Sequence, residues 1–305
     1  MIAFVFPGQG SQFAGMGRDL YENFAESKRV FDAADRILQF SLSKLCFDGP
    51  TEELTRTVNC QPAIFTVSLA ALAAFNKKVL IAKRRVSPNY FAGLSLGEYT
   101  ALVGAGALSF VDGISLVANR AKFMDEAAYI NPGKMSSILG LDLNAIKDIA
   151  GESGVHIANL NCPGQVVISG SIEAVDKANE LALRRGGKRV VNLEVSGAFH
   201  SPLMQPAGLR LAETLKNINI KEPATAVVSN VTAAAVFSPE QIKENLIRQL
   251  TGSVRWEESI RFMLGRGVNT FFEFGPGRVL RGLIRKIDAN TEVVNIGGAE
   301  DINKF

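Results

Sequence analysis

The segment Gly93-Leu94-Ser95-Leu96-Gly97 constrains the fold more than any other part of the sequence. It follows the β-prone run 90–92 and precedes a helical pattern over 98–103, so we expect a strand, a sharp turn and a helix in that order. Glycines on both sides of Ser95 let neighbouring backbone approach where a Cβ would clash. The hydroxyl is then exposed at a helix N-terminus, whose free N–H groups stabilise negative charge. The same pattern also occurs by chance, so the rest of the chain must supply partners for the serine.

The composition is that of an ordinary globular protein. The chain has 305 residues, of which 47% are hydrophobic and 21% charged, enough for one large domain with or without a smaller insert. A net charge of +3 is too small to indicate nucleic acid binding. Cys46, Cys60 and Cys162 have no spacing typical of a disulfide or a metal site, which favours a reducing compartment.

We expect a soluble, cytoplasmic protein with no membrane association. Residues 1–6 carry no basic leader or cleavage site, and no apolar run is expected to reach the length of a membrane span. Bacterial cytosol and an organelle whose targeting peptide has been removed both remain open. Lys77-Lys78 and Lys83-Arg84-Arg85 form a basic stretch, which is either a solvated face or a surface that attracts an acidic partner.

Strands and helices are expected to alternate along most of the chain. The expected strands cover residues 2–6, 90–92, 226–230, 270–274 and 293–294. The expected helices cover residues 61–75, 109–125, 204–216, 239–250, 256–264 and 279–284. This alternation favours an α/β fold with a mostly parallel sheet, and the turn at Ser95 makes it α/β-hydrolase-like.

Residues 133–195 have a different pattern. Strands are expected at 134–139, 155–160, 166–169 and 188–195, and helices at 143–151 and 172–185. That order is the split βαβ order of a ferredoxin-like module. We therefore expect a large α/β catalytic domain formed by residues 1–125 and 196–305, with a small ferredoxin-like domain, residues 126–195, inserted in it.

A serine hydroxyl becomes a good nucleophile only when a neighbouring base removes its proton, and histidine is the usual base. The chain has two histidines. His156 lies in a strand-like segment of the small domain, where a structural or surface role is favoured. His200 lies on a loop where the chain re-enters the large domain, and it is the candidate base. No acidic residue between Ser95 and His200 stands in an obvious loop, so an amide or a backbone carbonyl is expected to orient the histidine.

Attack of Ser95 on a carbonyl would generate an oxyanion. The backbone N–H of Leu96 and one N–H from a glycine turn are the donors best placed to stabilise it. The turn Pro7-Gly8-Gln9-Gly10 follows a strand, as Ser95 does, so both lie at the edge where parallel sheets place their sites. The alternative is that these glycines only form a tight turn.

With these features in view, the sequence closely resembles the malonyl-CoA:acyl carrier protein transacylases, the acyltransferases of type II fatty acid synthesis. The resemblance covers essentially the whole chain. It rests on four motifs in family order, Phe6-Pro7-Gly8-Gln9-Gly10-Ser11-Gln12, Gly93-Leu94-Ser95-Leu96-Gly97-Glu98, Gly197-Ala198-Phe199-His200-Ser201 and Phe274-Gly275-Pro276-Gly277.

The resemblance implies catalytic roles at matching positions. Ser95 matches the nucleophile that takes the malonyl group from coenzyme A, and His200 matches its base. Gln9 and Leu96 match the residues whose backbone amides form the oxyanion hole. Gln249 matches the residue that orients the histidine in place of an acid.

The resemblance also implies substrate contacts. Arg120 matches the arginine that holds the free carboxylate of malonate, and a guanidinium is suited to this because it stays charged and binds a carboxylate through two hydrogen bonds. Without the resemblance, Arg120 would be an ordinary arginine on a helix surface. Asn161 and Gln165 match a motif that lines the cleft, and Phe199 matches the malonyl-selective form of its motif. Leu94 departs from the family, which usually has histidine there.

The function implied is transfer of malonyl from malonyl-CoA to acyl carrier protein through a malonyl-serine ester, for fatty acid biosynthesis, by a monomer with no metal or redox cofactor. Carrier proteins of this pathway are acidic, so a transient docking surface is expected among Lys77, Lys78, Arg184, Arg185, Lys188 and Arg189. Two alternatives stay open. One is a serine esterase or thioesterase with water as acceptor, and the other is a non-catalytic protein that binds acyl-CoA or a carrier protein.

Overall fold

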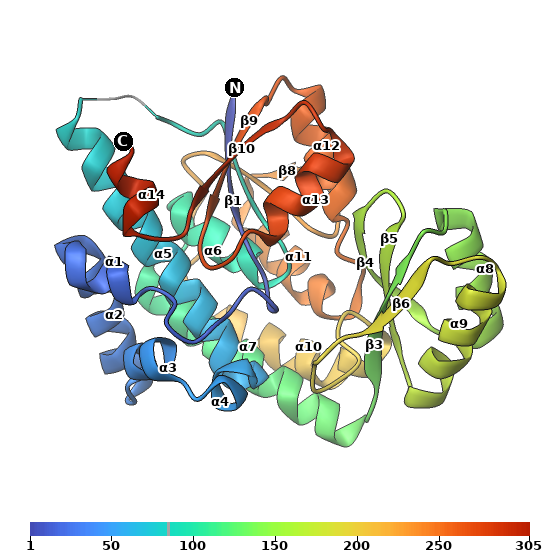
Figure 1. Cartoon of the computed structure of the whole chain (residues 1–305). Coiled ribbons are helices and arrows are strands. Elements are labelled where there is room, and N and C mark those ends of the chain that lie inside the picture. Colours follow the sequence, from blue (N-terminus) through green and yellow to red (C-terminus); the bar gives the residue numbers. More distant parts are fainter. Residues whose placement is uncertain (84–85) are drawn as a thin grey trace.

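The computed structural model describes residues 1–83 and 86–305 and contains a large α/β unit beside a small sheet (Figure 1). Arg84 and Arg85, which belong to the predicted basic stretch, lie outside the described residues. The expected α/β class is confirmed, with a mostly parallel sheet and a separate small antiparallel one.

The large sheet has six strands in the order β10-β9-β1-β2-β7-β8. They are β1 (Ile2–Phe6), β2 (Tyr90–Gly93), β7 (Ala226–Val228), β8 (Ala235–Val236), β9 (Thr270–Phe274) and β10 (Glu292–Ile296). Every neighbouring pair is parallel except β7 and β8, which are antiparallel. β8 is a two-residue edge strand that the sequence does not predict. The C-terminal ends of β1, β2 and β7 therefore lie together at one edge of the sheet.

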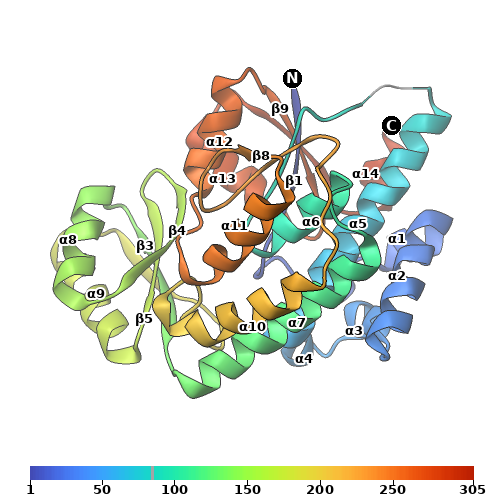
Figure 2. The same cartoon turned by 180° about the vertical axis from the view of Figure 1, so that it is seen from behind.

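Helices cover both faces of this sheet (Figure 1). The helices of the large unit are α1 (Arg18–Asn23), α2 (Ala25–Leu38), α3 (Leu42–Asp48), α4 (Thr51–Thr55), α5 (Thr57–Ile81), α6 (Leu96–Gly104), α7 (Phe110–Ile130), the 3₁₀ turn η1 (Pro202–Met204), α10 (Gln205–Lys216), α11 (Pro239–Thr251), α12 (Trp256–Gly265), α13 (Val279–Ile287) and α14 (Ala299–Asn303). Behind the sheet, α10 packs against both α7 and α11 (Figure 2).

The central strand β1 is buried on both faces. Phe4 and Phe6 belong to the core that α5, α6 and α7 form on one side. Ala3 and Val5 belong to a second core formed with α12 and α13 on the other side. Successive side chains of a strand point to opposite faces, so a strand between two helical layers must be apolar throughout.

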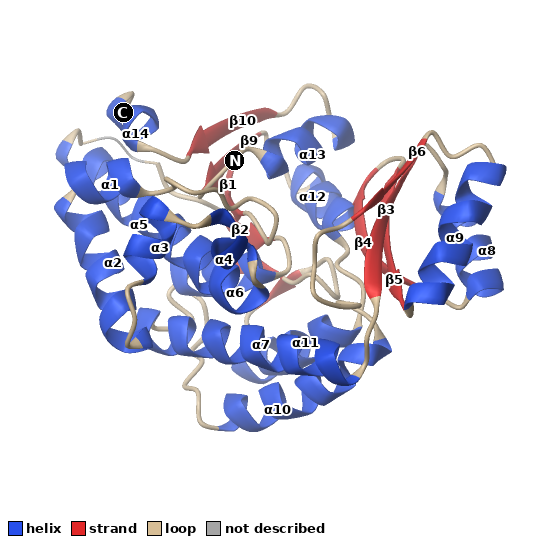
Figure 3. Ribbon diagram, turned by 60° about the horizontal axis from the view of Figure 1, so that its bottom comes forward, coloured by secondary structure: helices blue, strands red, loops and turns tan. Residues whose placement is uncertain are grey.

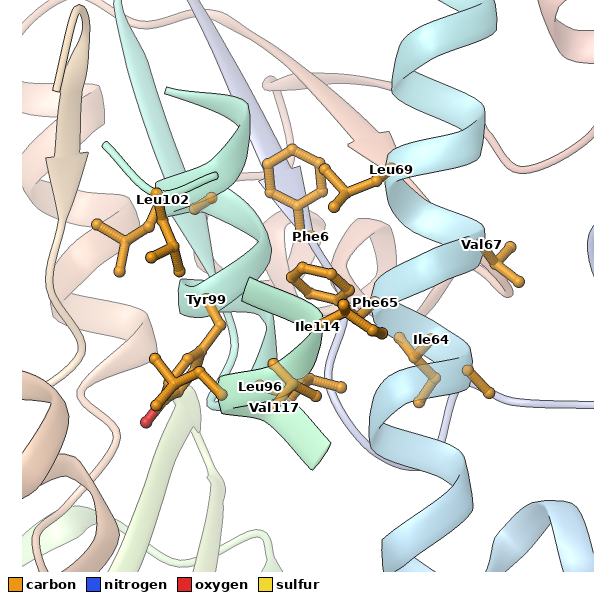
Figure 4. Close-up of a cluster of buried hydrophobic side chains, with 14 of the residues drawn as sticks. Phe6, Ile64, Phe65, Val67, Leu69, Leu96, Tyr99, Leu102, Ile114 and Val117 are labelled. Carbon is orange, nitrogen blue, oxygen red and sulfur yellow. The ribbon is translucent and has the colours of Figure 1, made fainter. Parts of the chain in front are cut away.

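The long helix α5 fills the centre of the first core. It covers residues 57–81 rather than the predicted 61–75, because apolar side chains lie on all its sides and no polar face marks its ends. From the sequence we expect no apolar run of membrane-spanning length, but α5 is long and apolar enough to cross a membrane. However, 67% of its most apolar stretch is buried inside the fold. Phe65 of α5 packs near Phe6 and Tyr99 in the cluster drawn in Figure 4.

The small unit is a four-stranded antiparallel sheet with two helices on the side away from the large unit (Figure 3). Its elements are β3 (Lys134–Leu139), α8 (Leu143–Ser153), β4 (His156–Cys162), β5 (Gln165–Gly170), α9 (Ile172–Arg184) and β6 (Arg189–Asn192), in the order and within a few residues of the bounds that the sequence predicts. Ile138, Ile146 and Val175 belong to a core of its own. Backbone hydrogen bonds between Ala158, Leu160 and Val254 join β4 to the large unit.

The helix that leads into the small unit ends later than predicted. α7 runs to Ile130 rather than to about residue 125, because Ala127 and Ala128 are buried and extend its apolar face by another turn. The predicted domain boundary at 125/126 consequently falls inside α7.

The turn at Ser95 brings three backbone segments into contact. Ser95 has φ 52° and ψ −102°, a backbone conformation that residues other than glycine rarely adopt. A Cβ on Gly97 would overlap the carbonyl oxygen of Phe6, and a Cβ on Gly93 would overlap Gly97. A Cβ on Gly8 would lie 2.6 Å from the carbonyl oxygen of Leu94. The glycines therefore allow β1, β2 and α6 to meet closely beneath the serine.

This packing predicts opposite effects for two glycine-to-alanine substitutions. Gly97→Ala should lower the free energy of unfolding by about 3 kcal/mol, the upper end of the usual cost of overpacking, because neither backbone segment can move aside. Gly151→Ala, at an exposed position of α8, meets no atom within 4 Å and should raise it by about 0.5–1 kcal/mol. Urea unfolding of both variants measures the difference. Equal stability of Gly97→Ala and the unsubstituted protein would contradict the close approach.

Candidate active site

Ser95 and His200 form a hydrogen-bonded pair. The Ser95 Oγ lies 2.8 Å from His200 Nε2. Ser95 stands between β2 and α6, and His200 stands in the turn before η1, where its φ of 57° and a hydrogen bond from Ser201 Oγ to the Ala198 carbonyl aim the ring at the serine. His156 is exposed on β4 in the small unit, away from this pair. Of the two histidines, only the predicted candidate reaches the serine.

A backbone carbonyl, rather than an acid, orients His200. The Nδ1 atom lies 2.7 Å from the carbonyl oxygen of Gln249 on α11. A carbonyl can only accept a hydrogen bond, so Nδ1 carries the proton and Nε2 is left to accept the serine proton. This is one of the two arrangements expected from the lack of an acidic residue in a suitable loop.

His200 is held neutral. Burial, together with the nearby positive charge of Arg120, lowers its pKa to about 4. A neutral imidazole can take up a proton, so the ring is in the form required of a general base over the whole neutral pH range.

Arg120 lies directly beside the serine, inside the protein rather than on a helix surface. It is 1% exposed, and its NH2 atom donates to Ser95 Oγ at 2.9 Å. It also donates to the side-chain oxygens of Gln61, at 2.6 Å, and of Gln249, at 3.1 Å, and stands over the ring of Tyr99. Burial lowers its pKa. Within residues 1–83 and 86–305, no carboxylate pairs with it directly, which leaves a buried positive charge available to an anionic group.

Two backbone N–H groups are available near the serine. The N–H groups of Gln9 and Leu96 both belong to residues that line the cleft around Ser95. Neither donates to a protein acceptor in the described part of the chain. The Ser11 hydroxyl holds the first turn by donating to the Gly8 carbonyl at 2.9 Å. This arrangement can stabilise an oxyanion.

Three supporting residues escape the sequence analysis. Asn230, just after β7, accepts from the Ser95 N–H at 2.7 Å and donates to the Gly93 carbonyl at 2.7 Å. Gln61 of α5 accepts from Arg120, and Glu98 of α6 accepts from the side chain of Gln249 at 2.6 Å. Asn230 carries a signal, since it is a polar residue at the C-terminal end of a predicted parallel strand. Glu98 closes the motif around Ser95, but the motif assigns it no role.

The remaining predicted residues line the same cleft of about 670 Å³ between the two units. They are Leu94, Phe199, Asn161 and Gln165. Phe199 is buried, Leu94 is partly buried against the second core, and the Asn161 side-chain oxygen is buried with no partner in the described residues. Gln165 accepts from Lys286 of α13 at 3.1 Å. Gln249 is the one predicted residue behind the cleft wall rather than on it.

Other reactive groups are poorly suited to chemistry. Burial raises the pKa of the Cys46 and Cys60 thiols to about 12, so neither is a thiolate at neutral pH. In the described ranges, histidine, cysteine and acidic side chains form no group of three or more that could hold a metal ion.

A serine activated by a neutral histidine, with free N–H groups and a buried guanidinium beside it, is an arrangement for acyl transfer. The family model described as "Acyl transferase domain" matches residues 3–298. The "Malonyl CoA-acyl carrier protein transacylase" of Bacillus subtilis strain 168 is 48% identical over 306 residues, covering 99% of this chain and 95% of that protein.

Solved structures agree with this match. The acyl-carrier-protein-S-malonyltransferase of Bartonella henselae superposes with a TM-score of 0.94 at 40% identity, covering 99% of this chain and 97% of that one. PlMCAT, a malonyl-transacylase solved in complex with the type II PKS acyl-carrier protein AntF, superposes with a TM-score of 0.92 at 39% identity. The match covers 99% of this chain and 98% of that one. The chain therefore belongs to the acyl transferase family and, within it, to the malonyl CoA-acyl carrier protein transacylases.

The environment of His200 predicts how the reactivity of Ser95 depends on pH. The rate of reaction with a fluorophosphonate probe should stay constant above about pH 5.5 and fall as the pH drops through about 4, because protonated His200 cannot accept the serine proton. The rate is measured by mass spectrometry of the labelled protein, with circular dichroism confirming that the fold persists. His200→Ala, the control, should react slowly at every pH. A fall centred near pH 6.5, the ordinary value for histidine, would contradict this prediction.

Proposed function

We propose that this protein transfers the malonyl group of malonyl-CoA to the phosphopantetheine thiol of an acyl carrier protein, through a malonyl ester on Ser95, for fatty acid biosynthesis. The observation that carries the proposal is the buried Arg120, which donates to the Ser95 hydroxyl and has no carboxylate partner of its own among the described residues. A simple esterase site has no use for such a charge. The names of the relatives support the same substrate and acceptor.

In the first half-reaction, Ser95 Oγ attacks the thioester carbonyl while His200 Nε2 takes up the hydroxyl proton. The oxyanion that forms accepts hydrogen bonds from the N–H groups of Gln9 and Leu96. When the tetrahedral intermediate collapses, the carbon–sulfur bond breaks and His200 returns the proton to the leaving thiolate. Free coenzyme A leaves, and the malonyl group stays on the serine.

The second half-reaction reverses these steps with a different thiol. His200 takes the proton of the phosphopantetheine thiol, the sulfur attacks the ester carbonyl, and the same N–H groups bind the oxyanion. Collapse returns the proton to Ser95 Oγ and releases the malonyl thioester. Throughout, Arg120 holds the free carboxylate, which keeps the reacting carbonyl beside His200 and the N–H groups. No step requires a metal or a redox cofactor.

Four residues of the cleft wall are proposed to select and hold the substrate. Phe199, buried beside His200, leaves little room for an α-methyl group and favours malonyl over methylmalonyl. Leu94 gives an apolar wall beside the nucleophile, where the family usually has a histidine. Asn161 and Gln165 offer polar groups to the amides of the pantetheine arm. The side-chain oxygen of Asn161, which is buried without a partner in the described part of the chain, supports this role.

An acidic carrier protein is proposed to dock on the side of the cleft formed by β6. Lys188 and Arg189 stand next to the cleft-lining residues 191–195. Lys77 lies farther away, since it is roughly 24 Å along α5 from Gln61, at about 1.5 Å per residue. We further propose a monomeric protein in the cytoplasm, where the three free, buried cysteines would stay reduced.

The finer fold assignments are also proposals. The strand order β4-β5-β3-β6 and the chain order βαββαβ support a ferredoxin-like small domain, and the strand, Ser95 turn and helix support a hydrolase-like large one. We place the small domain at about residues 126–195, with α7 shared by both parts at one border.

The proposed function predicts a covalent intermediate. Incubation with malonyl-CoA alone should add the mass of one malonyl group to the peptide that contains Ser95, and holo carrier protein should then remove it. Ser95→Ala should give no adduct, and His200→Ala should form it at least about 100-fold more slowly, the low end expected for loss of a general base. Intact-protein and peptide mass spectrometry measure both steps. Rapid loss of the adduct to water without carrier protein would indicate a thioesterase instead, and binding of malonyl-CoA without any adduct would indicate a non-catalytic protein.

The proposed role of Arg120 predicts a selective loss. Arg120→Ala should lower kcat/KM for malonyl-CoA at least about 30-fold, the equivalent of about 2 kcal/mol, because the carboxylate loses its partner in a buried site. Ester formation from acetyl-CoA, which has no carboxylate, should fall less. The exposed Arg210, stacked on Phe123 away from the cleft, gives the control Arg210→Ala, which should affect neither substrate. An equal loss for both substrates in Arg120→Ala would show that the arginine is only structural.

A further inference from the structure

A buried carboxyl group lies behind the serine and takes no part in the mechanism above. Glu98 occupies the first turn of α6, three residues after Ser95, and is 2% exposed. Its Oε2 atom accepts hydrogen bonds from the backbone N–H of Asn230, at 3.1 Å, and from Gln249 Nε2, at 2.6 Å. The cleft does not reach it, so it touches no substrate.

Gln249 connects this carboxyl group to Arg120. Its side-chain nitrogen donates to Glu98, while its side-chain oxygen accepts from the guanidinium of Arg120 at 3.1 Å. The same nitrogen also lies 3.0 Å from the Ser95 carbonyl oxygen, and the backbone carbonyl of Gln249 holds His200. The side-chain amide of Gln249 thus stands between the buried carboxyl group of Glu98 and the buried guanidinium of Arg120, and both its nitrogen and its oxygen are hydrogen-bonded.

This connection brings a negative charge close to the buried positive charge of Arg120. An isolated buried ion is costly unless an opposite charge lies near, and Arg120 has no carboxylate in direct contact among the described residues. Glu98 is the acid that reaches it, through one hydrogen-bonded amide, and such a polarised chain strengthens both bonds. A substrate carboxylate bound to Arg120 would bring a second negative charge to the same guanidinium.

We propose that Glu98 is a positioning residue that acts through the side-chain amide of Gln249, orienting Arg120 and balancing its charge until a substrate carboxylate takes over that role. The inference rests on the proposed function. It makes Glu98 a competitor of the malonyl carboxylate, so the resident acid weakens malonyl-CoA binding.

The decisive experiment compares Glu98→Gln with the unsubstituted protein. Glutamine keeps the size and an acceptor oxygen but removes the charge, so the half-saturating concentration of malonyl-CoA for ester formation should fall at least about threefold, within the range of coupling between connected residues. The half-saturating concentration of acetyl-CoA should change by less than threefold. Rapid quench followed by mass spectrometry of the Ser95 peptide measures both. No change, an equal change for both substrates, or a selective rise for malonyl-CoA would overturn the proposal.

Glu273→Gln is the matched control. Glu273 on β9 is equally buried, but it accepts from the backbone N–H groups of Leu280 and Arg281 at the start of α13, with no contact to Arg120 or Gln249. Loss of its charge should leave the ratio of the two half-saturating concentrations unchanged. A shift of that ratio equal to the one in Glu98→Gln would mean that any buried charge has this effect, and would overturn the proposal.

A double substitution tests the route through Gln249. Gln249→Met removes the amide but keeps the backbone carbonyl that holds His200. In this background, Glu98→Gln should no longer change the ratio of malonyl-CoA to acetyl-CoA, because the connection is already broken. A full additional effect would overturn the role of the amide.

If Glu98→Gln fails to fold, the pH dependence of the unsubstituted protein decides. Burial raises the pKa of Glu98 to about 7, so the carboxylate forms and begins to compete as the pH rises through that value. The groups that face the network are Arg120 from α7, Tyr99 from α6, Cys60 from α5 and His200. The pKa values of Tyr99 and Cys60, about 12, and of His200, about 4, lie outside the range from about pH 6 to 8. A guanidinium stays charged in proteins.

The half-saturating concentration of malonyl-CoA, divided by that of acetyl-CoA, should therefore increase over this pH range. Acetyl-CoA carries the same nucleotide phosphates, so their titration cancels in the ratio. A constant ratio would overturn the proposal. If the unsubstituted protein forms no malonyl ester at all, the proposed function fails instead, and the two failures are told apart.

Discussion

The guanidinium of Arg120, buried beside the Ser95 hydroxyl, is the contact on which the rest of the site depends. Burial of a charge is unfavourable unless several partners satisfy it, and three separate elements do so here. Gln61 comes from α5, Gln249 from α11 and the serine from the turn before α6. The guanidinium also stacks over the ring of Tyr99. α5, α6, α7 and α11 must therefore stand in fixed positions relative to one another, and the packing of phenylalanines around β1 supplies that rigidity.

The parallel sheet determines where these partners meet. β1, β2 and β7 are neighbours and end at one edge, so the turn of Gln9, the turn of Ser95 and the side chain of Asn230 follow three adjacent strands. Asn230 binds both Gly93 and the Ser95 N–H, which ties the third strand to the second. The small unit adds the opposite wall of the cleft from β3, β4, β5 and β6. Substrate groups far from the carbonyl can then be recognised without loosening the turn that holds the serine.

Much of this site can be predicted from sequence where a residue type has few alternatives. Ser95 is set by its two glycines, and His200 by elimination from two histidines. The supporting amides escape because glutamine and asparagine are common and act here only through contacts made in three dimensions. Gln61 lies in a helix that is apolar on all sides, where neither periodicity nor charge marks one face as special. The end of α7 escapes for a related reason, since two small buried alanines continue its face without a strong apolar signal.

Leu94 illustrates how the same network limits the effect of a departure from the family pattern. The residue precedes the nucleophile, but its side chain packs on the second core, while His200 is held from the other side by the Gln249 carbonyl. No hydrogen bond of Ser95, Arg120 or His200 involves that side chain. Leucine at this position therefore changes the polarity of the cleft wall and leaves the serine, its base and its charge in place. The hydrogen bonds that connect Arg120 through Gln249 to Glu98 do not involve Leu94, and Gln249 and Glu98 lie behind the cleft wall.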